Sequence, residues 1–197
     1  MPQSYSPLSC TGLAPHTGFR RPAYLSQRVS LDSPATAVFT DFDRVAAVTI
    51  GPSVPIEMAN QCMIAAAIRL LLVVDEHQEI VGLITATDIL GEKPYKHMQR
   101  SGETFSEILV SDLMSPQEEL DVLQLEDVTR ARVGDIVATL KYFGRQHALV
   151  VEAAGERAAQ RLRGIFSATQ IGRQLGMKVA PGEVATTFAQ LETALNS

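Results

Sequence analysis

RLLLVVD at residues 69–75 and VGLITATDIL at residues 81–90 are followed later in the chain by two similar strings, QHALVVE at 146–152 and RGIFSATQI at 163–171. Val73 and Val150 are 77 positions apart, whereas Gly82 and Gly164 are 82 apart, so the second copy carries five additional residues between its two strings. A repeat of this length indicates two similar units that complete one core together. A cleft between the two units is therefore the first place where a functional site is expected.

The composition fits a globular protein rather than a membrane or nucleic-acid-coating protein. The chain has 197 residues, of which 46% are hydrophobic, and this suits one compact body of two fused halves with an additional arm. The net charge of −5 disfavours a partner such as nucleic acid or an anionic membrane. No apolar run reaches about 18 residues, so no transmembrane helix is expected. A signal peptide is not expected either, and the cysteines, Cys10 and Cys62, form no disulfide framework, so a cytoplasmic location is expected.

Turn residues and apolar periodicity divide the chain into five segments. Residues 1–33, rich in Ser, Pro, Gly and Thr, are expected to form an extended N-terminal arm. The first unit is placed at 34–100 and the second at 113–178. A linking helix is predicted at 101–112, because Phe105, Ile108, Leu109 and Leu113 would share one face. The tail, 179–197, is expected to hold a short C-terminal helix.

Each unit is predicted to follow the order strand, helix, strand, strand, helix. The continuously apolar run at 70–74 is typical of a strand that is buried on both faces. The remaining elements are predicted from the spacing of apolar residues and from the turn residues on either side of each element. In the first unit they are a strand at 46–50, a helix with an apolar face from Ile56 to Ala66, a strand at 79–85 and a helix from 86. In the second unit they are strands at 120–125, 148–151 and 163–166, and helices over 133–140 and from 169.

This order, the LVVD strand at 72–75 and the turn Gly-h-h-Thr/Ser-x-x-Asp (h is apolar) resemble a tandem pair of CBS domains over residues 36–176. VSDLMSP at 110–116 resembles the segment that often precedes such a unit. The resemblance implies an α/β (α+β) fold in which two β-α-β-β-α repeats pack with pseudo-two-fold symmetry. It also implies a stand-alone regulatory module, not an enzyme, that binds an adenine nucleotide or adenosyl ligand, such as AMP, ADP, ATP or S-adenosylmethionine, between the repeats.

Thr85 and Asp88 occupy the family's ribose-binding positions in the first unit. The resemblance implies that Asp88 accepts hydrogen bonds from both ribose hydroxyls and that Thr85 contacts ribose or phosphate. A carboxylate can accept both bonds of a cis-diol, and the first turn of a helix favours negative groups. The same Thr-x-x-Asp pattern would equally suit a helix-capping arrangement. Both interpretations remain open from the local residues alone.

Three further residues are expected beside Asp88 because family sites carry basic or polar groups just before the central strand. Arg69 lies there in the first unit, and Gln146 and His147 lie there in the second. All three would face the ligand, since each cleft of the family draws on both repeats. The alternatives are a surface salt bridge for Arg69 and a partly buried structural role for His147.

The second cleft is expected to be weaker. Ser167 keeps the hydroxyl of the turn, but Gln170 replaces the aspartate, and Thr49 is expected to line the same cleft. A hydrogen bond to a charged acceptor contributes about 1.5–3 kcal/mol, against about 1 kcal/mol for a neutral one. The cleft with Gln170 is therefore predicted to bind a ribonucleotide more weakly than the cleft with Asp88, or not at all.

No catalytic constellation is evident in the sequence, and no catalytic cofactor is expected. The histidines, His16, His77, His97 and His147, lack metal-ligand spacing with cysteines or carboxylates, so no metal site is predicted. The resemblance implies a homodimer that forms through helical faces, and an unidentified protein effector as a further partner. The alternative function is a ligand-free CBS scaffold that serves as a dimerisation or protein-interaction unit.

Overall fold

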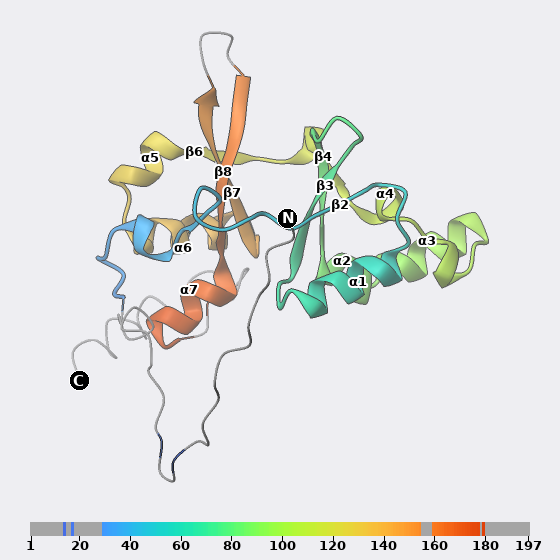
Figure 1. Cartoon of the computed structure of the whole chain (residues 1–197), viewed down its shortest axis with the longest axis horizontal. Coiled ribbons are helices and arrows are strands. Elements are labelled where there is room, and N and C mark those ends of the chain that lie inside the picture. The colour runs from blue at the N-terminus through green and yellow to red at the C-terminus, as the bar shows by residue number, and fades with distance from the viewer. Residues whose placement is uncertain (1–13, 15–16, 18–28, 155–158, 178, 180–197) are drawn as a thin grey trace, which may run out of the picture.

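Two four-stranded sheets organise the chain (Figure 1). The computed structural model describes residues 14, 17, 29–154, 159–177 and 179. The first sheet contains, in spatial order, β2 (Thr49–Ile50), β3 (Leu70–Val74), β4 (Ile80–Thr85) and β5 (Ser115–Pro116). The second contains β6 (Val122–Gln124), β7 (His147–Ala154), β8 (Ala159–Ser167) and β1 (Thr40–Asp41). In each sheet a parallel strand precedes an antiparallel hairpin, β2 beside β3–β4 and β6 beside β7–β8, so the predicted α/β repeat is confirmed.

Helices cover one side of each sheet (Figure 1). The first unit carries α1 (Ile56–Ala65), α2 (Ala86–Leu90), α3 (Lys93–Ser101) and α4 (Val110–Leu113), and the second carries α5 (Leu125–Arg130), α6 (Val133–Tyr142) and α7 (Ala168–Leu175). Short 3-10 turns form η2 (Ala35–Val38), η3 (Phe105–Glu107) and η4 (Gln117–Glu119). None of the described helices combines the length and apolarity that crossing a membrane requires.

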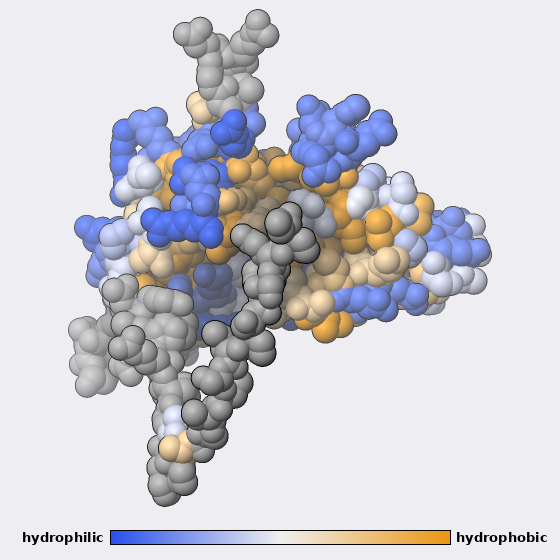
Figure 2. All heavy atoms as spheres, in the orientation of Figure 1, coloured by the Kyte–Doolittle hydropathy of each residue, from blue (hydrophilic) through white to orange (hydrophobic). Residues whose placement is uncertain are grey.

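The core has three parts because the central strands are apolar on both faces. In β3, Leu71 and Val73 pack with the helices of the first unit, whereas Leu72 faces a separate cluster with Leu149 and Ile165 of the second sheet. Alternation of side chains across a strand produces this division. The third cluster joins the two units, and the face shown in Figure 2 is accordingly most apolar between them.

The two units exchange their leading segments. Residues 35–41, which the sequence placed in the first unit, pack on the second: Thr40 pairs with Ile165, and Ala35 and Val38 are fully buried in the second unit's core. Conversely, β5 pairs with β4, and Val110 is buried in the first unit's core. The first unit was expected to begin at residue 34, but the residues that follow this boundary pack on the second unit.

The glycine of each repeated turn permits this exchange. A Cβ atom on Gly82 would lie 2.6 Å from the carbonyl oxygen of Ser115 in β5. A Cβ atom on Gly164 would overlap the carbonyl oxygen of Thr40 in β1. A side chain at either glycine would push the exchanged strand away from the sheet, which explains why both copies of the turn carry glycine.

The single linking helix predicted at 101–112 is wrong. That region forms the last residue of α3, the turn η3, an extended stretch at Ile108–Leu109 and the short helix α4. Ile108 accepts a hydrogen bond from the N–H of Ile56 at 3.0 Å, and the N–H of Val110 donates to Val54 at 2.9 Å. These bonds to a distant segment replace the intrahelical ones. The apolar spacing that suggested a helix instead reflects burial of Ile108 and Leu113 in the first core.

Two further predictions fall outside the described residues. The extended arm was placed at 1–33, and the structure describes only its last five residues together with Ala14 and Thr17. The short helix predicted over residues 184–195 of the C-terminal tail lies outside the described part of the chain.

Candidate ligand clefts between the two units

The Thr85–Asp88 turn is a closed capping box. Asp88 Oδ2 accepts hydrogen bonds from the backbone N–H of Thr85 at 2.8 Å and from Thr85 Oγ1 at 2.6 Å, and the N–H of Asp88 donates to Thr85 Oγ1 at 3.3 Å. Of the two interpretations that the sequence left open, the capping arrangement is therefore present. It uses one oxygen of the carboxylate and the Thr85 hydroxyl.

The second oxygen of Asp88 is held by Lys93. The ammonium group of Lys93 lies 2.6 Å from Asp88 Oδ1 and also donates to the carbonyl oxygen of Leu113 at 3.1 Å. Lys93 opens α3, and its side chain thus ties together α2, α3 and α4. The Asp88 side chain is only 12% exposed, so the charge is largely shielded from water and balanced by this lysine.

The cleft beside this turn, called here the Asp88 cleft, has a volume of about 410 Å³. Thr85, Thr87 and Asp88 line it from the first unit, and Gln146 and His147 line it from the second. Its other charged residues are Glu119, Asp121 and Arg145, and Arg145 Nη2 donates to Asp121 Oδ2 at 2.7 Å. Asp88 is paired with Lys93 and Asp121 with Arg145, so Glu119 leaves the lining with a net negative charge and no cation that is free to meet a phosphate group.

The equivalent turn of the second unit opens a different cleft, called here the Gln170 cleft, of about 500 Å³. Much of its wall is apolar, with Val48, Ala66, Ile68 and Ile165 among the lining residues. Its charged side chains, Arg69 and Arg173, have no ion-pair partner among the residues that the structure describes, and no carboxylate belongs to the described lining.

The polar groups of the Gln170 cleft are less committed than those of the Asp88 cleft. Gln170 Oε1 accepts one hydrogen bond, from Thr40 Oγ1 at 3.1 Å, which leaves the amide N–H groups to donate. Ser167 precedes α7 without forming the side-chain cap that Thr85 forms in the first unit. Thr40 reaches this cleft because β1 is exchanged onto β8.

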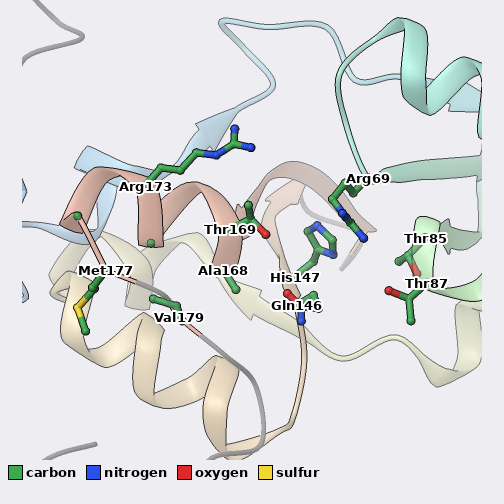
Figure 3. Close-up of a pocket in the computed structure, with 12 residues that line it drawn as sticks. Arg69, Thr85, Thr87, Gln146, His147, Ala168, Thr169, Arg173, Met177 and Val179 are labelled. Carbon is green, nitrogen blue, oxygen red and sulfur yellow. The ribbon is translucent and has the colours of Figure 1, made fainter. Parts of the chain in front are cut away.

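A third cavity, called here the central cavity, has a volume of about 760 Å³ and shares lining residues with both clefts (Figure 3). It shares Arg69, Thr169 and Arg173 with the Gln170 cleft, and Thr85 and Gln146 with the Asp88 cleft. Figure 3 shows Arg69 beside His147, with Thr85 and Thr87 facing them from the first unit. The Gln170 cleft therefore continues into a larger space that begins at its two arginines.

His147 lines all three spaces. Burial, followed by the nearby positive charge of Arg69, lowers the pKa of His147 from 6.5 to about 4. At neutral pH the imidazole is therefore uncharged and can accept or donate a hydrogen bond.

A comparison with family models identifies residues 40–94 as a CBS domain. The chain thus contains a CBS domain. The matched residues include β3, β4 and the Thr85–Asp88 turn.

Solved structures extend the similarity of this CBS protein to the whole pair of units. An uncharacterised conserved protein from Pyrococcus horikoshii superposes with a TM-score of 0.52 at 17% identity, over 73% of this chain and 92% of that one. A CBS-domain containing protein from Agrobacterium tumefaciens gives 0.50 at 22% identity, over 68% and 88%. CBSX2 of Arabidopsis thaliana, in a complex with AMP, gives 0.51 at 20% identity, over 72% and 94%. At these identities the similarity concerns the fold, which is that of a CBS pair.

Most of the predicted site residues line one of the two clefts, but they are distributed between the clefts differently from the prediction. Thr85, Asp88, Gln146 and His147 line the Asp88 cleft, whereas Arg69 lines the Gln170 cleft and the central cavity. The carbonyl oxygens of Arg69 and Gln146 accept equivalent hydrogen bonds, from Ala86 and Ala168, so these two residues hold corresponding positions on opposite sides of the pair.

Thr49 does not join Ser167 and Gln170. It lines a separate cavity with Asp75 and Glu76, at the turn after β3. Val48 lines the Gln170 cleft, and successive side chains of a strand point to opposite faces, so Thr49 faces away from it.

Thr40 and Arg173 are among the polar lining residues of the Gln170 cleft that sequence reasoning missed. Arg173 lies three residues after Gln170, on the same side of α7, so its helical spacing was a usable signal. Thr40 carried no such signal, because its place depends on the exchange of β1.

Proposed function

We propose that this CBS protein is a non-catalytic regulatory module that binds an adenine nucleotide or another adenosyl ligand, with the Gln170 cleft as its principal site. One observation carries the choice of cleft: an apolar wall adjoins two arginines that have no carboxylate beside them in the described lining. The AMP complex of CBSX2, which shares the fold, supports the class of ligand.

The lining suits the three parts of a nucleotide. Val48, Ile68 and Ile165 offer the apolar contact that an adenine ring favours. The Ser167 hydroxyl and the Gln170 amide can form hydrogen bonds with ribose hydroxyls.

Phosphate groups would meet the guanidinium groups of Arg69 and Arg173, whose planar arrays of N–H donors fit phosphate oxygens. Both arginines also line the central cavity, so a chain of several phosphates has space to extend there. AMP, ADP and ATP are therefore all compatible with this cleft. S-adenosylmethionine, which carries a positive charge, suits the arginines less well.

The proposal reverses the ranking that the sequence suggested. The Asp88 cleft was expected to be the stronger site because a carboxylate is the better hydrogen-bond acceptor. In the folded protein a ligand there would have to displace Lys93 from Asp88 and approach Glu119 and Asp121. Both requirements reduce the affinity of the Asp88 cleft for a phosphorylated ligand.

A ligand in the Gln170 cleft would connect the two units. The cleft is formed by residues 66–70 of the first unit and by β8 and α7 of the second. Binding would therefore favour one relative arrangement of the units over another, by an amount equal to the difference in affinity between the two arrangements. This is how the module would regulate a partner.

The homodimer that the sequence predicts stays part of this proposal. Met58 and Ile64 on α1, and Leu90 on α2, are exposed apolar side chains on the helical side of the first unit. A second copy of the chain would bury them. Sedimentation equilibrium with and without nucleotide tests this association. The cytoplasmic location and the unidentified effector are predictions of the same kind.

Calorimetric titration with AMP, ADP, ATP and S-adenosylmethionine tests the proposed function. We expect one site per chain for at least one nucleotide, with affinity reduced at least about tenfold in Arg173→Ala, which removes a charge-assisted hydrogen bond, and unchanged in Asp88→Asn. Binding that is lost in Asp88→Asn and kept in Arg173→Ala would place the ligand in the other cleft. A folded wild-type protein that binds none of these ligands would favour the scaffold function.

A further inference from the structure

Three metal-ligating side chains meet at the far end of α3, away from both clefts. His97 lies in the last turns of α3, Glu103 follows that helix, and Asp112 lies in α4. One potential ligand atom from each residue lies within 4.8 Å of the others, and His97 Nε2 is 2.7 Å from Glu103 Oε2. No metal site was predicted from the sequence, because the members of this group are separated by intervals that match no familiar metal motif.

The local backbone holds the first two residues of the group together. Gly102, with φ of 79°, ends α3 in the left-handed conformation and turns the chain back. Ser101 Oγ donates to the carbonyl oxygen of His97 at 3.1 Å and accepts from the N–H of Glu103 at 3.2 Å. These contacts return Glu103 to the histidine one turn earlier in the helix.

Asp112 supplies the third oxygen from a separate segment. Its Oδ2 accepts the N–H of Leu109 at 2.8 Å, which caps α4 and fixes the side chain. No described residue donates to Oδ1, so this oxygen is available to a ligand.

The charge at this place favours a cation. Two carboxylates lie beside the C-terminal end of α3, where the helix dipole is negative. Within the described ranges Glu103 has one ion-pair partner, His97, and Asp112 has none.

We propose that His97, Glu103 and Asp112 bind a divalent transition-metal ion of the Zn²⁺ type, with water completing the coordination. An imidazole with carboxylates suits such an ion better than Mg²⁺ or Ca²⁺, which prefer oxygen ligands alone. Bonds of about 2.0–2.1 Å in a tetrahedral site place the ligand atoms about 3.3 Å apart. Rotation of the Glu103 side chain, which is 45% exposed, is enough to open its contact with His97 to that spacing.

The ion would cross-link α3 to α4. Lys93 bridges the same two helices from the opposite end of α3, through its bond to the carbonyl oxygen of Leu113. A metal ion would therefore stiffen the helix pair that holds Lys93 against Asp88. This site is independent of nucleotide binding, because none of its residues lines either cleft.

Competition between the chelator-treated full chain and a chromophoric chelator for Zn²⁺ tests the proposal. We expect a site of one ion per chain whose affinity falls at least about tenfold in both His97→Ala and Asp112→Asn, because each removes a ligand. Asp112→Asn keeps the side-chain oxygen that caps α4, so we expect this variant to fold. The matched control is His77→Ala, which alters an exposed histidine outside the proposed site whose imidazole lies beside Glu76.

A thermal melt gives a second measurement. Zn²⁺ should raise the midpoint of the wild type and of His77→Ala but leave that of His97→Ala unchanged, because only an ion that binds the folded state stabilises it. Equal Zn²⁺ affinity in the wild type and in His97→Ala, or the absence of any such site in the wild type, would overturn the proposal.

Discussion

The Asp88 cleft and the Gln170 cleft are built on the same turn and differ in what their polar groups already bind. Asp88 is the better ribose ligand by chemistry, yet one of its oxygens caps α2 and the other is paired with Lys93. Gln170 is the poorer acceptor, yet it stands in an apolar cleft beside two arginines. The comparison shows that a motif residue is informative about binding only when its hydrogen-bonding capacity is not used within the protein.

Removal of both arginines should have the largest effect on nucleotide binding. We expect Arg69→Ala combined with Arg173→Ala to weaken AMP and ATP binding by about 100-fold or more, because each charge-assisted bond contributes about 1.5–3 kcal/mol. Calorimetry measures this change. Arg130→Ala is the control, since that exposed arginine pairs with Glu126 on α5. Wild-type affinity in the double variant would remove the basis for choosing the Gln170 cleft.

Release of Asp88 should open the other cleft. In Lys93→Met the Oδ1 atom of Asp88 loses its ammonium partner and joins Glu119 in attracting a cationic adenosyl ligand. We therefore expect S-adenosylmethionine to gain a second site, at least about tenfold tighter than any in the wild type. Lys96→Met is the matched control, because Lys96 lies one turn further along α3 and pairs with Glu92. Equal stoichiometry in the wild type and in Lys93→Met would mean that Lys93 does not block the cleft.

A carboxylate in the second turn should sharpen ribose recognition. Gln170→Asp supplies a charged acceptor where the turn now has an amide, and we expect AMP affinity to rise about three- to tenfold, with a smaller gain for 2′-deoxyadenosine monophosphate. Parallel titrations with the two nucleotides measure the difference. An unchanged preference between them would show that Gln170 does not contact the ribose.

Titration of His147 should affect the stability of the fold rather than nucleotide binding. The folded-state pKa is about 4, below the unfolded value of 6.5, so the unfolded chain binds more protons between these two pH values. The free energy of unfolding is therefore highest above pH 6.5 and falls as the pH drops through this window.

We expect His147→Gln to lose this dependence, which amounts to at most about 2 kcal/mol between pH 7 and pH 5. Urea denaturation at the two pH values measures it, with His77→Gln as the control because that side chain is exposed. The same pH dependence in His147→Gln and in the wild type would assign it to another group.

The repeat was enough to predict the two hairpins and the two turns. Leu70–Val74 is apolar throughout because one face of this strand packs on the helices of the first unit and the opposite face packs on the second sheet. A continuous apolar run of this kind is visible in the sequence. Gly82 and Gly164 mark the places where an exchanged strand approaches closely. These features are visible in a single sequence because they depend on residues that are close together in the chain, or on positions where only glycine fits.

The exchange itself and the state of Asp88 could not be predicted in the same way. Thr40 pairs with Ile165, which is remote in sequence, and no residue pattern near Thr40 indicates this partner. Lys93 lies in a helix that the sequence did not separate from α2, so its pairing with Asp88 was hidden. Long-range packing decides both, and the candidate site depends on both.

A crystal structure of the protein with its tightest-binding nucleotide tests the central claim most directly. We predict adenine against the apolar wall of the Gln170 cleft, phosphate at Arg69 and Arg173, and Lys93 still paired with Asp88. Nucleotide in the Asp88 cleft, with Lys93 displaced and the Gln170 cleft empty, would contradict the account.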